Sequence, residues 1–245
     1  QNELGIYENK PGEFNKIDGD LAKIDFVEFI NQNPIGRSSR SNPVTYIKAY
    51  DDIRALFSSH KLSIQRSYKP KHFSFNVDGG RCDKCKGDGE ITIEMQFMAD
   101  VHLVCDQCKG SRFKKEILDV KYLDKNIFDI LNMTINQALK FFELANELKI
   151  YKKLLPLKNV GLGYVKLGQS SSTLSGGEAQ RIKLAYFLGK ANNNKKGVFI
   201  FDEPTTGLHT DDIKKLLKSF NSLIDIGNTI IIVEHNLELI KYIIN

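Results

Sequence analysis

The sequence predicts an α/β protein in which stretches with parallel strands flank a mostly helical insertion that carries a cysteine-bearing hairpin. Residues 198–201 are an unbroken apolar run, and residues 229–233 are a threonine followed by four apolar residues; both are typical of parallel strands that are buried on both faces. The residues between these runs have the apolar spacing of one amphipathic helix, which predicts a strand–helix–strand crossover. Two C-x-x-C pairs in the middle of the chain predict the hairpin.

The chain begins with few structural signals. Residues 24–30 are rich in isoleucine, valine and phenylalanine and predict a further strand, and a polar, proline-punctuated loop follows at 31–43. The 245 residues suffice for one large domain or two small ones. A net charge of +5 permits a polyanionic partner without demanding one. Because the chain contains neither a membrane-spanning run nor a signal peptide, we expect a soluble, cytoplasmic protein with no membrane partner.

Residues 174–178, Leu-Ser-Gly-Gly-Glu, lead directly into an apolar-periodic helix. Two glycines allow a tight turn, and a serine before a helix start leaves a hydroxyl and free N–H groups near the positive end of the helix dipole. This tip could bind a phosphate. An ordinary capped surface helix explains the same five residues equally well. The residues concerned are Ser175, Gly176, Gly177 and Glu178.

Two acids follow the first apolar run directly, and a histidine follows the second run closely. Asp202 and Glu203 should therefore lie at the carboxyl edge of the sheet, where α/β proteins bind ligands. Asp202 is placed to hold Mg²⁺ and Glu203 to polarise a water molecule. Helix capping is the alternative role for this acid pair. His235 should lie at the same edge, within reach of a nucleotide's terminal phosphate.

All four cysteines of the chain fall in two C-x-x-C-x-G segments, and alternating apolar residues in 90–104 predict a hairpin that brings the segments together. Since we expect an intracellular chain, a four-thiolate zinc site is favoured over disulfides. Four thiolates complete a tetrahedron, so His102 is not needed as a ligand. The predicted Zn²⁺ ligands are Cys82, Cys85, Cys105 and Cys108.

Two basic stretches are candidates for contact with DNA phosphates. Residues 60–72 contain three lysines and one arginine, no acidic residue, and interleaved aromatic residues. The cysteine segments are also flanked by basic residues. A solvated basic face explains the first stretch equally well, and a purely stabilising zinc ion is the alternative for the second. The basic residues near the cysteines are Arg81, Lys84, Lys86, Lys109, Arg112, Lys114 and Lys115.

Two further helices have clear boundary signals. Thr134 and Gln137 form a capping box that predicts a core helix with an apolar stripe continuing to Leu148. Pro156 is expected to end the next helical segment.

The residues at the predicted sheet edge resemble the motifs of ATP-binding-cassette ATPases. Residues 174–178 resemble the signature motif, the apolar run into Asp202 and Glu203 resembles Walker B, and His235 resembles the switch histidine. The resemblance implies that Asp202 coordinates Mg²⁺, Glu203 activates water and His235 contacts the γ-phosphate of ATP. It also implies that Gln32 senses Mg²⁺ and links the nucleotide site to an inserted domain.

With the cysteine module added, nearly the whole chain from about residue 24 resembles the UvrA family, the damage-recognition subunits of the bacterial excision nuclease. This resemblance implies a partial ATP-binding core at 1–33 and 191–245, interrupted by a signature domain at 34–190 with a zinc module at about 78–115. It also implies a head-to-tail arrangement in which Ser175, Gly176 and Gly177 complete an ATP site opened by another cassette's phosphate loop. Family members dimerise, bind double-stranded DNA, load UvrB at lesions and hydrolyse ATP.

The sequence departs from the family in one respect, because it contains no G-x-x-x-x-G-K-[ST] phosphate-binding loop. We therefore expect an ATPase only in the complete protein, with this loop upstream or in another stretch that this chain lacks, and an inactive isolated chain. Two alternatives remain: a non-enzymatic zinc-containing binding module of DnaJ type, whose C-x-x-C-x-G repeats are similar, and another soluble ATP-binding-cassette ATPase.

Overall fold

The computed structural model describes residues 13, 15–36, 38, 40–95, 98, 100–190, 195–208, 210–237 and 240. The chain forms two compact units. Unit 1 contains residues up to 33, residues 159–162 and residues from 175 onward, and unit 2 contains residues 34–158 and 163–174. The division of the chain at residues 33 and 190 that the family resemblance implies stays a prediction.

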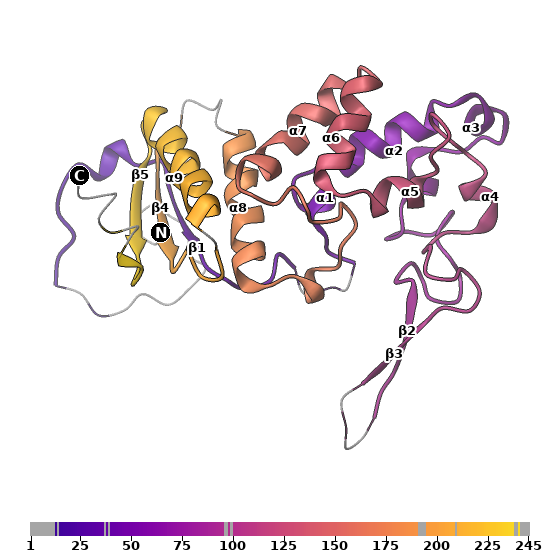
Figure 1. Cartoon of the computed structure of the whole chain (residues 1–245), viewed down its shortest axis with the longest axis horizontal. Helices are drawn as coiled ribbons and strands as arrows, with labels where there is room; N and C mark the ends of the chain where they lie inside the picture. Colours follow the sequence, from indigo (N-terminus) through magenta and orange to yellow (C-terminus); the bar gives the residue numbers. More distant parts are fainter. Residues whose placement is uncertain are drawn as a thin grey trace. The chain divides into compact units, whose positions relative to one another are not determined.

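Unit 1 contains a three-stranded parallel sheet of order β1-β4-β5 (Figure 1). In the sheet register, Phe29 lies beside Ile200 and Ile200 lies beside Ile231. The expected strand–helix–strand crossover at the carboxyl end is confirmed. The elements of unit 1 are η2 (Leu21–Lys23), β1 (Phe26–Ile30), α8 (Gly176–Lys190), β4 (Gly197–Asp202), α9 (Thr210–Asp225) and β5 (Thr229–Val233).

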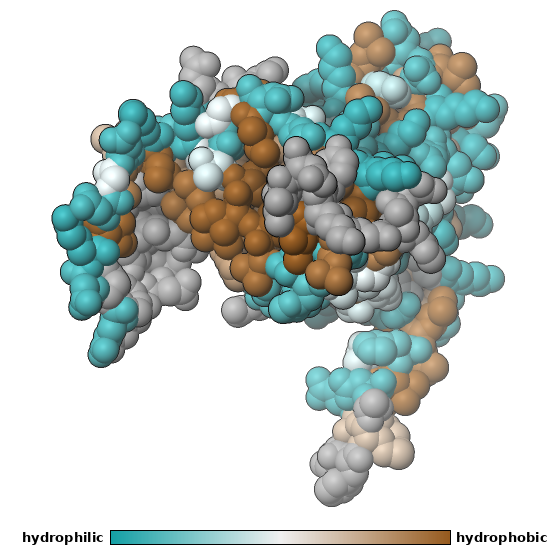
Figure 2. All heavy atoms as spheres, turned by 60° about the vertical axis from the view of Figure 1, so that its left-hand side comes forward, coloured by the Kyte–Doolittle hydropathy of each residue, from teal (hydrophilic) through white to brown (hydrophobic). Residues whose placement is uncertain are grey.

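Helices α8 and α9 cover one face of this sheet through aromatic contacts. The rings of Phe187 and Phe199 lie 5.2 Å apart, and those of Phe201 and Phe220 lie 4.6 Å apart. Because side chains alternate along a strand, the neighbouring positions point to the opposite face. There, exposed apolar side chains include Phe29, Ile231 and Val233, and a space-filling view shows apolar surface on unit 1 (Figure 2). Within the part of the chain that the structure describes, only one face of the sheet is covered. The expectation that these strands are buried on both faces is therefore wrong for the described residues, because no described helix packs on the face that carries Phe29, Ile231 and Val233.

Unit 2 is mostly helical, and its core is rich in aromatic side chains. Phe57, Phe73 and Phe75 are fully buried, and the Tyr50 hydroxyl donates to the Phe73 carbonyl at 2.6 Å. The elements of unit 2 are α1 (Pro43–Tyr46), α2 (Tyr50–Ser58), α3 (Lys61–Gln65), η3 (Pro70–Phe73), β2 (Glu90–Ile93), β3 (Val101–Val104), α4 (Lys115–Leu118), α5 (Ile127–Asn132), α6 (Ile135–Leu144), α7 (Leu148–Asn159) and η4 (Ser171–Thr173).

The capping box that starts α6 is confirmed, since Thr134 and Gln137 exchange two hydrogen bonds of 2.9 and 3.2 Å. The expected end of this helix was wrong: α6 ends at Leu144, because Asn146 adopts a left-handed backbone with φ +57°. Pro156 also does not end its helix but lies inside α7. The fully buried Leu154 and Leu157 beside it supply packing that compensates for the lost backbone hydrogen bond.

The expected hairpin is present as the antiparallel pair β2 and β3, with Ile91 opposite Leu103. Its strands project away from the helices of unit 2 (Figure 1), and most of their side chains are exposed. Phe97 and Ala99, near the expected turn of the hairpin, lie outside the described residues. None of the described helices is long and apolar enough to cross a membrane.

Candidate functional site

The tip of α8 is held by a reciprocal cap. The Ser175 N–H donates to Glu178 Oε2 at 2.8 Å, and the Glu178 N–H donates to Ser175 Oγ at 3.2 Å. This is a capping box, which satisfies donors that a helix start leaves open. Ser175 is nevertheless exposed, so the tip stays accessible to solvent. The serine oxygen is engaged with its own helix, while its hydroxyl hydrogen can still be donated to a ligand.

Both glycines of the tip are required for close packing inside unit 1. A Cβ atom on Gly176 would lie 2.8 Å from Gln32 Oε1, and one on Gly177 would lie 2.9 Å from the Thr206 carbonyl oxygen. Such distances are shorter than a carbon atom tolerates. The α8 tip therefore packs directly on Gln32 after β1 and on the turn after β4. This packing requirement exists independently of any anion.

Helix α8 also binds the carboxyl ends of two strands. The buried Gln180 side chain donates through Nε2 to the Ile30 carbonyl at 2.9 Å and the Asp202 carbonyl at 2.8 Å. One turn further along the helix, Lys183 Nζ donates to the backbone and side-chain oxygens of Asn31 at 3.1 and 2.9 Å. Burial lowers the pKa of Lys183. These contacts fix the ends of β1 and β4 against α8.

Gln32, Asp202, Glu203 and His235 all come to the carboxyl edge of the sheet, as the parallel strands require. Gln32 Nε2 approaches the Glu203 carbonyl at 3.4 Å, and the Glu203 N–H donates to the Val233 carbonyl at 2.9 Å. Glu203 has a left-handed backbone with φ +46°, an uncommon conformation for a residue other than glycine. Strain of this kind is found where the surrounding structure holds a residue in place.

The Glu203 carboxylate and the His235 ring meet in solvent. His235 Nε2 lies 3.4 Å from Glu203 Oε1, and the His235 side chain is 81% exposed. Thr206 Oγ1 is at 3.5 Å from the other carboxylate oxygen, Glu203 Oε2. An accessible carboxylate beside an imidazole can accept a proton from water, and the exposed Asp202 next to it offers an oxygen ligand for a cation.

Glu234 connects two turns at this edge. Its Oε2 accepts from the Thr205 N–H at 3.1 Å and from the Thr205 hydroxyl at 2.7 Å. Its Oε1 accepts from the N–H groups of His235 and Asn236 at 2.9 and 3.1 Å. Burial raises the pKa of Glu234, but these hydrogen bonds outweigh it and leave the pKa below its usual value. Sequence reasoning assigned Glu234 no role.

Behind the α8 tip lies a buried guanidinium with open hydrogen-bonding capacity. Arg181 is 5% exposed, and within the described residues its Nε and Nη1 have no hydrogen-bond partner. Its Nη1 lies 3.5 Å from the position of a Cβ on Gly177. Gln180 Oε1 is likewise buried without a partner in this part of the structure. Burial of a charge or an amide oxygen without a partner is costly, so these groups mark a place where the described packing is incomplete.

The four cysteines of unit 2 form one cluster. Their sulfur atoms all lie within 4.8 Å of one another, with Cys82 and Cys105 Sγ 3.9 Å apart and Cys85 and Cys108 Sγ 3.6 Å apart. None of the four is in a disulfide. A tetrahedral zinc with Zn–S bonds of 2.3 Å requires sulfur separations of about 3.8 Å. The cluster therefore fits a four-thiolate zinc site.

Hydrogen bonds and backbone conformation support this geometry. The Gly89 N–H donates to Cys85 Sγ at 3.2 Å, and the glycine of each C-x-x-C-x-G segment has a positive φ, +92° at Gly87 and +82° at Gly110. Burial raises the pKa of Cys105, but the backbone N–H groups of Cys108 and Gln107 outweigh it and lower that pKa to about 7. His102 bonds Thr92 across the hairpin instead, at 3.1 Å.

The cysteine module carries no excess positive charge. Several of its cations are paired: Lys84 with Asp106 at 2.7 Å, Lys114 with Asp83 at 2.8 Å, and Arg81 with Asp78 at 2.7 Å. Arg112 lies over the ring of Phe75. Residues 78–115 contain seven basic side chains, at 81, 84, 86, 109, 112, 114 and 115, and seven acidic ones, at 78, 83, 88, 90, 94, 100 and 106.

The basic stretch at 60–72 presents more open positive charge. Lys61, Lys69 and Lys71 are exposed, and the rings of Tyr68 and His72 lie 5.2 Å apart. Arg66 is paired with Asp119 at 2.9 Å. Exposed cations beside aromatic rings suit a nucleic acid backbone.

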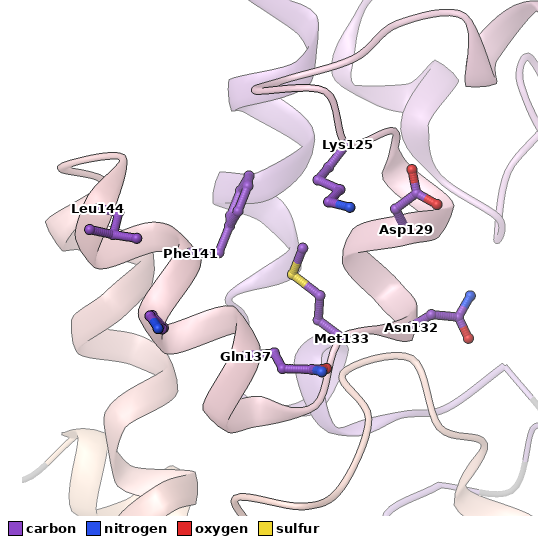
Figure 3. Close-up of a pocket in the computed structure, with 8 residues that line it drawn as sticks. Lys125, Asp129, Asn132, Met133, Gln137, Phe141 and Leu144 are labelled. Carbon is purple, nitrogen blue, oxygen red and sulfur yellow. The ribbon is translucent and has the colours of Figure 1, made fainter.

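A shallow groove of about 510 Å³ also lies in unit 2, between α5 and α6 (Figure 3). Met133, Phe141 and the 79% exposed Leu144 form its apolar part, and Lys125 and Asp129 lie at its side. It contains none of the predicted site residues.

No family model matches the chain. The chain is 57% identical over 231 residues to UvrABC system protein A of Clostridium acetobutylicum, which covers 94% of the chain and 24% of that protein. It is 53% identical over 232 residues to the protein of the same name from Staphylococcus aureus, with 95% and 24% covered. The crystal structure of UvrA2 from Deinococcus radiodurans matches with a TM-score of 0.85 and 45% identity, over 92% of this chain and 27% of that one.

The expected similarity to UvrA is thus confirmed over nearly the whole chain, and the expected α/β fold is confirmed with it. The chain spans about a quarter of the length of the UvrA proteins it matches. The comparisons test none of the individual site residues, so their roles stay predictions.

Proposed function

We propose that this chain is the part of a UvrA-type DNA repair ATPase that supplies the magnesium, water-activating and signature residues of an ATP site. In the complete protein, ATP hydrolysis would be coupled to recognition of damaged double-stranded DNA and to loading of UvrB by a homodimer. The similarity to UvrA over 94% of the chain supports this function over a DnaJ-type binding module.

The observation that carries the proposal is the meeting of the polar residues at one sheet edge. Asp202 would hold Mg²⁺, Glu203 would activate the attacking water, and His235 would contact the γ-phosphate of ATP. The 3.4 Å separation of Glu203 and His235 supports a shared task. Mg²⁺ would polarise the phosphate oxygens, whereas the chain's own carboxylate would orient the water and accept its proton.

Gln32 and the α8 tip would link this site to other parts of the protein. Gln32 contacts both the Glu203 carbonyl and the Gly176 backbone region, so a ligand that moves the magnesium residues would also act on the tip. Ser175, Gly176, Gly177 and Glu178 would complete an ATP site whose phosphate loop comes from another cassette of the dimer. The accessible Ser175 supports this role.

We further propose that the cysteine cluster holds Zn²⁺ and that the basic stretch at 60–72 contacts DNA phosphates. The neutral charge of the cysteine module favours a mainly stabilising role for its metal. The exposed side chains of Lys61, Lys69 and Lys71 favour the basic stretch as the phosphate-binding surface.

The ATPase proposal is tested in the complete protein with Glu203→Gln. This change keeps the size of the side chain but removes the proton acceptor, so steady-state ATP hydrolysis should fall at least a hundredfold, as expected for a lost general base. Binding of a fluorescent ATP analogue should stay within a few fold of the parent. Unchanged hydrolysis would refute the role of Glu203.

The DNA proposal is tested by duplex binding of the complete protein across a salt series. Lys69→Gln together with Lys71→Gln should weaken binding and lower the salt dependence by about one unit of slope per lost phosphate contact. Lys140→Gln, an exposed lysine on α6, serves as the matched control. Equal slopes for the double variant and this control would rule out the basic stretch as the phosphate-binding surface.

A further inference from the structure

Glu234 has a hydrogen-bonding environment that a simple turn does not need. Each of its two carboxylate oxygens accepts two hydrogen bonds, and the four donors lie between 2.7 and 3.1 Å away. Capping the turn after β5 requires only Oε1, which accepts from the N–H groups of His235 and Asn236. The other oxygen is used entirely by Thr205, which belongs to the turn after β4.

Glu234 therefore bridges the ends of two adjacent strands. Thr205 is 6% exposed, so water competes little for its hydroxyl. Hydrogen bonds to an ionised carboxylate are stronger than neutral ones. A backbone bond from the Glu203 N–H to the Val233 carbonyl, 2.9 Å long, joins the same two strand ends. Together these contacts hold the turn after β4 against the turn after β5.

The bridged turns carry Glu203 and His235, neither of which is fixed by burial of its side chain. Their side chains are 45% and 81% exposed and meet at 3.4 Å. Glu203 also has the left-handed φ of +46°, which must be imposed by its surroundings. Glu234 contacts Thr205, which is two residues after Glu203 in the chain, and it accepts directly from the His235 N–H.

We propose that Glu234 is a positioning residue for ATP hydrolysis, which with Thr205 holds Glu203 and His235 at the separation that water activation requires. This inference rests on the proposed function, in which Glu203 accepts the proton of the attacking water. Glu234 itself touches neither water nor nucleotide in this role. It acts through the geometry of the two turns.

The test uses steady-state ATP hydrolysis by the complete protein with four single variants. Thr205→Val keeps the shape of the side chain but removes the hydroxyl donor, whereas Thr205→Ser keeps the donor. Glu234→Gln places an NH₂ group against two donors, whichever way its amide turns. Glu203→Gln reports on the proposed function itself.

Thr205→Val and Glu234→Gln should lower kcat about ten- to a hundredfold, the scale expected for a misplaced reacting group. The KM for ATP should stay within about twofold, because a positioning residue affects the reaction more than ground-state binding. Thr205→Ser, which keeps the hydroxyl donor, should have a kcat within about threefold of the parent. In a Glu203→Gln background, Thr205→Val should cause no further loss in single-turnover rate, because both changes act through one carboxylate.

The outcomes separate the two ideas. Normal kcat in Thr205→Val, beside an inactive Glu203→Gln, overturns the positioning role and leaves the proposed function standing. Unchanged hydrolysis in Glu203→Gln overturns the proposed function and this inference with it. A fall in melting temperature of Thr205→Val with unchanged kcat at lower temperature would show a structural cap only. If Glu234→Gln does not fold, the comparison of kcat between Thr205→Val and Thr205→Ser tests the positioning role by itself.

Discussion

Replacement of one cysteine should weaken metal binding and destabilise the fold of the cysteine module. Among the described residues, the buried cluster of the module consists of Cys82, Cys85 and Cys105, and the partly buried hydrophobic residues packed against it are Ile91 and Cys108. Hairpin strands β2 and β3 expose most of their side chains, and a two-stranded hairpin is marginal in water on its own. Few apolar contacts would thus remain without the metal, which must supply most of the stabilisation.

The magnitude follows from the ligand set. Structural zinc sites contribute an apparent ~10–16 kcal/mol at neutral pH. If the four thiolates share this about equally, Cys108→Ser costs ~2.5–4 kcal/mol, which weakens zinc binding about 70- to 900-fold. None of the described helices contains one of the four cysteines. The far-UV circular dichroism of the chain should therefore change only slightly.

Two measurements on the purified chain check this expectation. Competition with a chelator of known affinity gives the zinc affinity, and amide hydrogen exchange reports whether Ile91 and Leu103 still pair across the hairpin. His102→Ala is the matched control, because His102 lies in the same hairpin but bonds Thr92 rather than the cluster. We expect parent-like zinc affinity in His102→Ala and an affinity about a hundredfold lower in Cys108→Ser. Parent-like affinity in Cys108→Ser, or a protected hairpin without metal, would refute the reasoning.

Three further outcomes are expected. The isolated chain should not bind a fluorescent ATP analogue at micromolar concentration, because it has no G-x-x-x-x-G-K-[ST] loop; saturable micromolar binding would contradict this. In the complete protein, Gly176→Ala should lower ATP turnover, since the added Cβ would lie 2.8 Å from Gln32 Oε1 and displace it from Glu203; steady-state rates test it. Because folding lowers the pKa of Glu234, the stabilisation by its carboxylate is present above the usual pKa of 4.5 and lost as the pH falls through the lowered value. The free energy of unfolding, measured with urea, should therefore fall more between about pH 5 and 3 for the parent than for Glu234→Gln.

The sheet and the cysteine cluster could be predicted because their signals are local in the sequence. Unbroken apolar runs predicted β4 and β5, and the spacing of the two C-x-x-C pairs predicted one thiolate cluster. The acids after β4 were predictable for the same reason, since parallel strands bring their carboxyl ends to one edge. Each of these features depends on residue type and spacing alone.

The contacts that fix the site could not be predicted because they join segments far apart in the sequence. Gln180 reads as the polar side of an amphipathic helix, yet it is 2% exposed and bonds two strand ends. Helix α8 is buried on more than its apolar stripe, so apolar periodicity says little about which polar residue turns inward. Pro156 and Asn146 show the same limit, because the end of a helix depends on tertiary packing as well as on local preference.

Charge separates the two roles that a metal module near DNA could have. A zinc ion with four thiolates carries a net charge of about −2, and the side chains of residues 78–115 balance to zero. With zinc bound, the module would therefore be weakly repelled by phosphate. Ion pairs within the module, such as Lys84 with Asp106, also neutralise cations that could otherwise contact phosphate. We therefore expect attraction to DNA phosphates to come from the exposed Lys61, Lys69 and Lys71, which lie in a stretch without acids. In this proposal, the metal would hold the shape of the hairpin, whereas the basic stretch would supply the positive charge that attracts DNA.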